Sequence, residues 1–235
     1  MVNPESFTAA NPRQSRHTRA DVVAAALQLL DDYGLPDLTM RRLAATLDVQ
    51  PSALYWHVSN KQTLLALVSD EIVASRVVAD DTGAAVAADW KRATRAEASA
   101  LRDALLSYRD GAEVVSSSLA LGLGGGAAEL RLADAIALGN FDPTVCAMAA
   151  STLLHFILGH VSHEQQRLQA DSLGVVSAEH AASVGDLDDV AGGPGAGAPA
   201  RSLGPRDSFD FGVTLLLDGL ESARRNASST GAVRR

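Results

Sequence analysis

Apolar residues recur at helical spacing along most of this 235-residue chain. Val23, Leu27 and Leu30 form one stripe, which predicts a first helix from about Arg19 to Tyr33, and Gly34 is suited to end it. Aromatic residues are only 4% of the chain, so its core would be built mainly from Ala, Leu and Val, a bias that favours packed helices. The pattern predicts an all-α fold. Comparable stripes predict further helices over about 61–80, 86–109, 127–138, 142–168 and 206–225.

Residues 39–61, TMRRLAATLDVQPSALYWHVSNK, predict two short helices joined by a tight turn. Thr39 can cap the first helix, because its hydroxyl can accept a hydrogen bond from an amide left free at the helix start. Asp48 tolerates the left-handed backbone that a sharp turn needs, and Pro51 suits the first position of the second helix. Two such helices with a polar and aromatic outer face are the geometry that places one helix in the major groove of DNA.

Three segments lack this regular spacing. Residues 1–16 are expected to form a disordered arm, which is either inert or contacts DNA through Arg13 and Arg16. Residues 110–126 are rich in serine and glycine, so they predict a mobile loop or a short broken helix. Residues 183–205 are low in complexity and predict a flexible loop, because they cannot bury enough apolar surface to become ordered.

The net charge of −8 is unevenly distributed. Residues 1–61 contain six Lys or Arg and six Asp or Glu, whereas residues 62–235 contain 14 and 22, so the whole excess lies in the second part. Local charge matters more than total charge when a protein meets phosphates, and Arg13, Arg16 and Arg19 cluster where the first helix begins. This division favours DNA binding by the first part. The acidic second part would discourage non-specific binding along DNA.

The single cysteine, Cys146, excludes an intrachain disulfide and a cysteine metal cluster. We expect it to be a small buried apolar residue, with a redox sensor as the alternative. No apolar run is expected to reach the roughly eighteen residues needed to span a bilayer, and the N-terminus lacks the apolar block of a secretory signal. We therefore expect a cytoplasmic protein without membrane contact.

Residues 54–72, LYWHVSNKQTLLALVSDEI, resemble the recognition helix and the following helix of the TetR family of one-component regulators. The similarity of the DNA-binding part extends over about 17–72. Weaker similarities to the C-terminal domain of the tetracycline-repressor type occur at 102–114, 153–166 and 215–224.

This resemblance implies two helical domains in an all-α protein. A three-helix helix-turn-helix DNA-binding domain would cover 17–62, after the arm at 1–16. A helical ligand-binding and dimerisation domain would cover 63–235. The resemblance also implies a homodimer with a four-helix-bundle interface, to which each protomer gives the helices at 142–168 and 206–225.

The resemblance assigns roles on the DNA-binding motif. Arg41 matches the family's guanine reader, and a guanidinium fits the acceptor pair on guanine. Trp56 would touch the groove wall, or would instead pack with Tyr55 as a core aromatic between the three helices. The positions that set sequence preference are occupied by Pro51, Ser52 and Ala53. The phosphate contacts are assigned to Tyr55, His57 and Lys61.

The resemblance also implies a ligand pocket in the C-terminal domain. Val115 aligns with a histidine that binds a metal ion in drug-binding members of the family, and Val77 replaces another pocket histidine. Ser118 is the conservative polar match, so we expect the pocket to hold a largely apolar molecule without a metal ion or other cofactor. The aligned pocket positions are Val77, Glu97, Leu101, Val115, Ser118 and His155.

A cluster of histidines on one predicted helix has a metal-binding interpretation and a plainer one. His155, His160, His163 and Glu164 include spacings of three and four residues, which suit metal ligation. No second cluster supplies the remaining ligands, so the alternative is a helix face near the dimer seam. Neither a nucleophile–base pair nor a phosphate-binding glycine motif is evident.

The sequence thus favours a homodimeric transcription regulator. The leading hypothesis is a repressor that a small, largely apolar molecule releases from a palindromic operator. One alternative is a DNA-binding regulator or architectural protein without an inducer, and an operator-release assay separates the two. Another is an enzyme that uses the histidine cluster, which a metal-content measurement tests. Activation in place of repression stays open.

Overall fold

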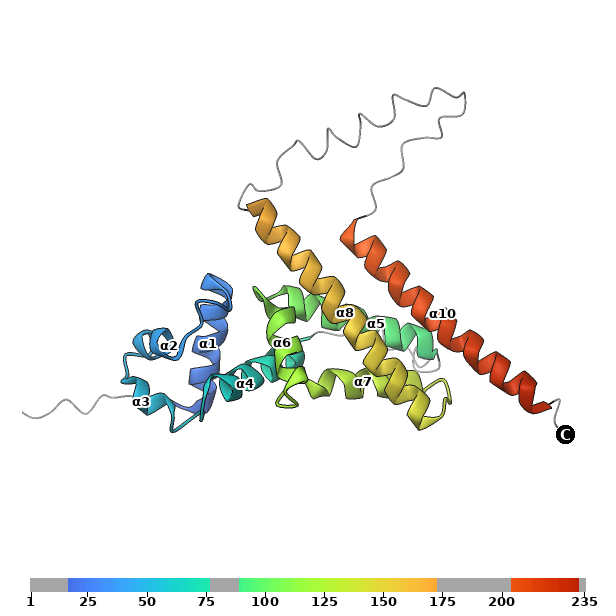
Figure 1. The fold of residues 1–235 in the computed structure, drawn as a ribbon, viewed down its shortest axis with the longest axis horizontal. Coiled ribbons are helices and arrows are strands. Elements are labelled where there is room, and N and C mark those ends of the chain that lie inside the picture. Colours follow the sequence, from blue (N-terminus) through green and yellow to red (C-terminus); the bar gives the residue numbers. More distant parts are fainter. Residues whose placement is uncertain (1–16, 77–88, 173–203, 233–235) are drawn as a thin grey trace, which may run out of the picture.

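The computed structural model describes residues 17–76, 89–172 and 204–232, and within these ranges every regular element is a helix. The all-α fold expected from the sequence is confirmed. In chain order the helices are α1 (Arg19–Tyr33), α2 (Met40–Thr46), α3 (Pro51–Leu54), α4 (Lys61–Ala74), α5 (Trp90–Leu106), α6 (Gly111–Ala120), α7 (Gly126–Ala137), α8 (Pro143–Ser172) and α10 (Pro205–Ala232). Figure 1 shows α1, α2 and α3 at one end, the helices from α5 to α10 at the other, and α4 running between the two groups.

Side-chain caps begin the helices of the N-terminal part. Thr18 and Asp21 form a reciprocal capping box at α1, in which each side chain accepts a hydrogen bond from the other residue's backbone amide. Thr39 accepts from the amide of Arg42 at α2, and Asn60 accepts from the amide of Thr63 at α4. The cap expected at Thr39 is therefore confirmed, and Asn60 caps α4 in the same way.

The turn between α2 and α3 is also as expected. Asp48 has φ +52°, in the left-handed region, and Pro51 is the first residue of α3. Apolar residues from all four helices of this part form one core, which includes Leu30, Leu43, Leu54, Val58 and Leu64, each at most 1% exposed. This core sets the angle between α2 and α3, because neither short helix could bury its apolar face alone.

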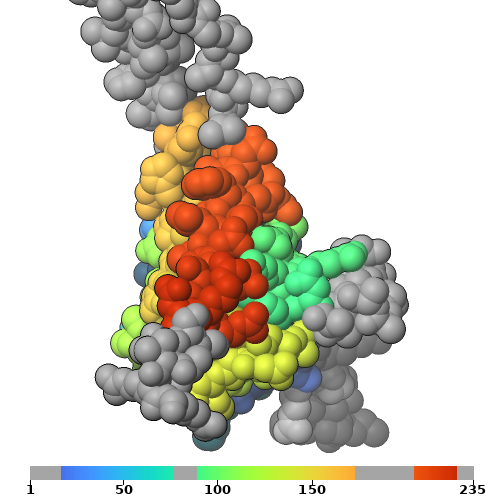
Figure 2. Space-filling view, turned by 90° about the vertical axis from the view of Figure 1, so that its right-hand side faces the viewer, coloured from blue at the N-terminus to red at the C-terminus, as the bar shows by residue number. Residues whose placement is uncertain are grey.

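The C-terminal part is built around α8. This helix packs against α5, α6, α7 and α10, and it buries Leu154, Ile157 and Val161. Figure 2 shows α10 lying across one face of the molecule, with α8 on one side of it and α5 on the other. Cys146 is 4% exposed, and burial raises the pKa of its thiol, so the expectation of a buried small residue is confirmed.

The central helix is more apolar than the sequence analysis allowed. α8 is long and apolar enough to cross a membrane, with a mean hydropathy of 1.5 over its most apolar eighteen-residue window. The expectation that no such run exists was wrong. Because α8 contacts four other helices, its apolar composition also serves the interior of the domain.

The segment 110–126 was predicted wrongly as a mobile loop or a short broken helix. Gly111–Ala120 form α6, and only the turn before α7 is glycine-rich and non-helical. Val114 and Val115 are fully buried in the core, and α6 packs against α4 and α8. Tertiary packing therefore outweighs the weak helix propensity of its serines and glycine.

Several predicted boundaries also need correction. α4 has 14 residues where about twenty were expected, and α5 ends at Leu106 and not at Arg109. α8 continues to Ser172, beyond the expected end at Leu168, and α10 continues to Ala232. α10 begins at Pro205, so the helix includes the last residue of the loop predicted at 183–205. The arm at 1–16 and the loop residues 183–203 lie outside the described residues.

Candidate nucleic-acid interface and effector site

The surface of α3 and the turn after it combines buried anchors with exposed aromatic side chains. Leu54 and Val58 are 1% exposed and hold this segment to the core. Between them, Tyr55 is 53% exposed and Trp56 is 90% exposed. The alternative in which the two aromatics pack in the core is therefore wrong, and both rings are accessible to a partner.

Two neighbouring arginines on α2 have different surroundings. Arg42 pairs with Asp37 at 2.8 Å, and its guanidinium lies 4.6 Å from the ring centre of Tyr33. Arg41 is exposed, and among the described residues none forms a hydrogen bond or ion pair with its side chain. Arg41 is thus the arginine of this helix that is free to contact a base.

The remaining predicted DNA-contacting residues lie around the same segment. Pro51 and Ser52 are exposed on α3, and Ala53 is half-buried. His57 is half-buried in the turn after α3, and Lys61 is half-buried at the first position of α4. With Arg41 and the two aromatics, all eight residues predicted from the sequence occupy α2, α3, the turn after α3 and the start of α4.

Two long-range contacts behind this surface were not predicted from the sequence. A ring nitrogen of His17 lies 2.9 Å from the carbonyl oxygen of Leu47, and the Nε of Arg19 donates to the carbonyl oxygen of His57 at 3.1 Å. The start of α1 is therefore attached to the end of α2 and to the turn after α3. The partners are 30 and 38 residues apart in sequence, so no local pattern indicates these contacts.

The C-terminal half of α4 is joined by polar contacts to three other helices or turns. Asp70 accepts a hydrogen bond from the amide of Gly125, in the turn before α7, at 2.7 Å. The carbonyl of Val73 accepts from the guanidinium of Arg131 on α7 at 3.2 Å. Arg76, just beyond the helix, pairs with Glu97 on α5. Movement in the C-terminal domain can therefore be transmitted to α4 at three points.

A second junction connects the domains through Asp110. One carboxylate oxygen accepts from the amide of Leu35, in the loop after α1, at 2.8 Å, and the other accepts from the side chain of Gln169 on α8. Gln165, one turn earlier on α8, holds the turn between α5 and α6 by donating to the carbonyls of Leu105 and Tyr108. The loop after α1 is thereby tied to α8.

Three of the predicted pocket residues are buried, Leu101 on α5 and both Val115 and Ser118 on α6. Leu101 is 2% exposed, Val115 is fully buried and Ser118 is 3% exposed. The hydroxyl oxygens of Ser118 and of Ser69 on α4 are buried without a hydrogen-bond partner among the described residues. Buried hydroxyls of this kind need a ligand group or a water molecule, because an unsatisfied polar atom costs about 1–3 kcal/mol.

The other three predicted pocket residues are not shown as buried, unoccupied lining: one is ion-paired, one is exposed and one is not described. Glu97 is 12% exposed at its side chain and is occupied by Arg76. His155 is exposed on α8. Val77 lies outside the described residues.

Two protein-family models match this chain, one in each part. "Bacterial regulatory proteins, tetR family" matches residues 22–68, and "Tetracyclin repressor-like, C-terminal domain" matches residues 83–224. The chain belongs to the TetR family.

Individual TetR-family proteins are similar to this chain along most of their length. The class G tetracycline repressor protein of Vibrio anguillarum is 31% identical over 225 residues, covering 90% of this chain and 97% of the relative. The structure of Mycobacterium smegmatis BioQ matches with a TM-score of 0.69 at 38% identity, covering 88% of this chain and 98% of that one. BioQ solved with its natural double-stranded DNA operator matches with a TM-score of 0.64 at 36% identity, covering 87% and 98%. ActR of Streptomyces coelicolor, in complex with (S)-DNPA, matches with a TM-score of 0.65 at 28% identity, covering 88% and 98%.

This TetR-family chain is therefore a ligand-responsive DNA-binding repressor, and the family acts as dimers. The resemblance deduced from residues 54–72 is confirmed, as is the helix-turn-helix followed by a helical C-terminal domain.

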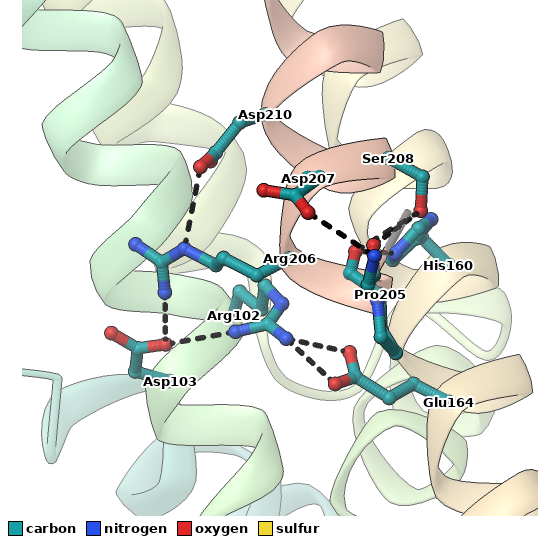
Figure 3. A network of polar contacts seen from close by, with 10 residues as sticks. Arg102, Asp103, His160, Glu164, Pro205, Arg206, Asp207, Ser208 and Asp210 are labelled. Carbon is teal, nitrogen blue, oxygen red and sulfur yellow. Dashed lines mark hydrogen bonds and ion pairs between the residues drawn. The ribbon is translucent and has the colours of Figure 1, made fainter. Parts of the chain in front are cut away.

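Two residues of the predicted histidine face of this TetR-family chain, His160 and Glu164, are engaged in contacts between helices. Figure 3 shows Arg102 of α5 between Glu164 of α8 and the start of α10. Its guanidinium donates to both carboxylate oxygens of Glu164, at 2.7 and 2.8 Å, and lies 5.4 Å from the ring centre of Phe209. A ring nitrogen of His160 lies 3.0 Å from the carbonyl oxygen of Pro205. Within the described ranges no three His, Cys, Asp or Glu residues are grouped to hold a metal ion.

The other end of α10 is tied to α5 through Lys91. Its ammonium forms ion pairs with Glu221 and Asp218. The hydrogen bonds from Lys91 lower the pKa of both carboxyls, and those carboxylates raise the pKa of Lys91. Between the two ends, α7, α8 and α10 line an apolar hollow of about 220 Å³.

Proposed function

We propose that the surface of α2, α3 and the start of α4 binds a palindromic operator. The carrying observation is the exposure of Trp56 and Tyr55 between two anchors that are only 1% exposed. In this proposal Arg41 reads a guanine, and Pro51, Ser52 and Ala53 influence the preferred sequence. Tyr55, His57 and Lys61 contact phosphates, as a hydroxyl, a ring N–H and an ammonium can. The protein would act in the cytoplasm, where it meets DNA.

The effector would act through α4. A ligand between α4, α5 and α6 would meet Leu101 and Val115 as apolar walls and the free hydroxyls of Ser69 and Ser118 as polar points. Its binding would shift the C-terminal half of α4 and so change the separation of the two recognition surfaces in a dimer. These must lie about 34 Å apart to fit adjacent major grooves. A coupling of about 1–3 kcal/mol would change operator affinity about 5- to 150-fold.

The dimer interface would be formed by α8 and α10. Their outer faces carry large apolar side chains that the chain itself leaves exposed: Met148 is 59% exposed, Phe211 is 69% and Leu215 is 61%. A second copy of the same surface would cover them, giving the four-helix interface expected from the sequence.

An operator-release experiment tests this function. Genomic fragments bound by the purified chain are selected, and the best duplex is labelled for fluorescence anisotropy. Fractions of small molecules from cell extracts are then added to the complex. We expect saturable binding to the selected duplex and release by at least one fraction. Binding that no fraction releases would favour a regulator without an effector, and equal binding to every duplex would contradict the proposed function.

A further inference from the structure

The ion pair between Arg76 and Glu97 is geometrically specific. The Nε of Arg76 donates to both carboxylate oxygens of Glu97, at 3.1 and 2.9 Å, and one terminal nitrogen donates to a carboxylate oxygen at 2.9 Å. The side chains are only 19% and 12% exposed, so the pair is largely removed from water. Such fork-shaped contacts are among the stronger polar contacts in proteins.

The two partners differ in how firmly the backbone holds them. Glu97 lies in the middle of α5, next to buried Ala98 and one turn before buried Leu101. Arg76 lies beyond α4, after Ser75, which ends that helix. The backbone that carries Glu97 is therefore held in α5, whereas Arg76 lies beyond the end of α4 and can move away and return to water.

This asymmetry decides which charge a ligand would carry. An anionic ligand that took Arg76 would leave Glu97 buried without a cation, and removing one partner of a buried pair is strongly unfavourable. A cationic ligand that took Glu97 would keep the carboxylate paired and release Arg76 to solvent. The Glu97 carboxylate thus favours a ligand whose cationic group replaces the guanidinium of Arg76.

We propose that Glu97 binds a cationic group of the effector, an amine or an amidine, in the place that Arg76 occupies here. This inference rests on the proposed function and names the chemical class of its effector. Leu101 lies one turn along α5 from Glu97, so the cation would be attached to an apolar body. The ligand is a cationic amphiphile, whereas the sequence suggested a largely apolar, metal-free molecule.

Replacement of Arg76 also supplies a route to the DNA. It removes the contact between the end of α4 and α5, while Asp70 and Val73 keep their contacts to the following turn and to α7. The end of α4 would then pivot about the remaining contacts. Operator affinity falls when Arg76 is displaced.

A set of three probes with one apolar body tests the charge requirement. 3-Phenylpropylamine is a cation at neutral pH, 3-phenylpropanol is uncharged and 3-phenylpropanoate is an anion. Calorimetric titration measures their binding to the wild-type chain, to Arg76→Gln and to Glu97→Gln. Arg206→Gln is the matched control, because it breaks the more exposed ion pair with Asp103 in the same domain. Circular dichroism verifies that each variant is folded.

We expect Arg76→Gln to bind the amine at least about tenfold more tightly than the wild type, because the internal competitor is gone. Glu97→Gln should lose amine binding, and Arg206→Gln should match the wild type. The alcohol should not distinguish the variants, and the carboxylate should not bind Arg76→Gln more tightly than the wild type. A merely structural ion pair predicts the opposite for Arg76→Gln, because its loss would weaken the site.

Amine binding that is equal in the wild type, Arg76→Gln and Glu97→Gln overturns the inference, as does the absence of amine binding in all of them. Calorimetry reads the site without DNA, so this failure is distinct from failure of operator binding. A second readout is operator affinity by anisotropy: the amine should lower it for the wild type and leave it unchanged for Glu97→Gln.

Discussion

At the surface of α2, one arginine is bound by its own chain and its neighbour is free. Arg42 is paired with Asp37, whereas Arg41 is exposed. A free guanidinium beside α3 suits base contact, and the ammonium of Lys61 at the start of α4 suits phosphate contact. The two residues should therefore affect DNA binding in different ways.

We predict that Arg41→Ala costs about 1–3 kcal/mol on the preferred duplex and little on a scrambled one. Lys61→Ala should weaken binding to both duplexes alike and reduce the salt slope by about one. Anisotropy titrations at two salt concentrations measure both effects. An unchanged salt slope for Lys61→Ala would remove it from the phosphate contacts.

At the scale of the elements, the turn between α6 and α7 fits closely against α4. A Cβ atom at Gly124 would lie 2.6 Å from the carbonyl oxygen of Ala66, whereas one at Gly126 would meet nothing within 4 Å. We predict that Gly124→Ala lowers the free energy of unfolding by about 1–3 kcal/mol, because α4 and the turn must separate. Gly126→Ala is the matched control and should be neutral or stabilising by up to about 1 kcal/mol. Urea titrations compare the two, and equal stability would mean that the turn adjusts freely.

Elements marked by local signals were predictable from the sequence. Thr39 and Asn60 act as caps, Asp48 adopts the left-handed turn, and Pro143 begins α8, with Asp142 accepting from the amide of Thr144. Each feature depends on residues within about four positions. α6 could not be predicted in this way, because Val114 and Val115 become helical core only when α4 and α8 are present.

The candidate sites also differ in whether nearby or distant residues in the sequence determine them. The DNA-facing residues lie within one short motif, so the sequence placed them together. The contacts that join the domains connect distant residues: Leu35 with Asp110, and Arg76 with Glu97. Glu97 was aligned with a pocket position, but nothing near it in sequence shows that an arginine 21 residues earlier occupies its carboxylate.

At the scale of the whole molecule, the proposed dimer interface gives Leu217 and Phe211, both on α10, different roles. Leu217 is 2% exposed and serves the chain's own core, so an acidic residue there would damage the fold. We predict that Phe211→Asp, at a site 69% exposed, yields folded monomers. Leu130→Asp on α7, at a site 68% exposed, is the matched control and should remain dimeric. Sedimentation measures both, and a dimeric Phe211→Asp would place the interface elsewhere.

Similarity to tetracycline repressors raises the question of tetracycline itself. We predict that magnesium–tetracycline neither binds tightly nor releases this chain from DNA. A chelated magnesium ion needs oxygen or nitrogen ligands, and fully buried Val115 offers an isopropyl group. Unpaired polar groups of the drug against Leu101 would cost about 1–3 kcal/mol each. Calorimetric titration beside an operator-release assay decides the point, and submicromolar binding with release would refute the prediction.

The central claim is that α2 and α3 of two protomers recognise a specific DNA sequence. The most direct measurement is a titration of the purified chain with its selected duplex and with a scrambled duplex of equal length at physiological salt. The account predicts two protomers per selected duplex and an affinity about 10³-fold or more above that for the scrambled duplex. Equal affinity for the two duplexes would contradict it.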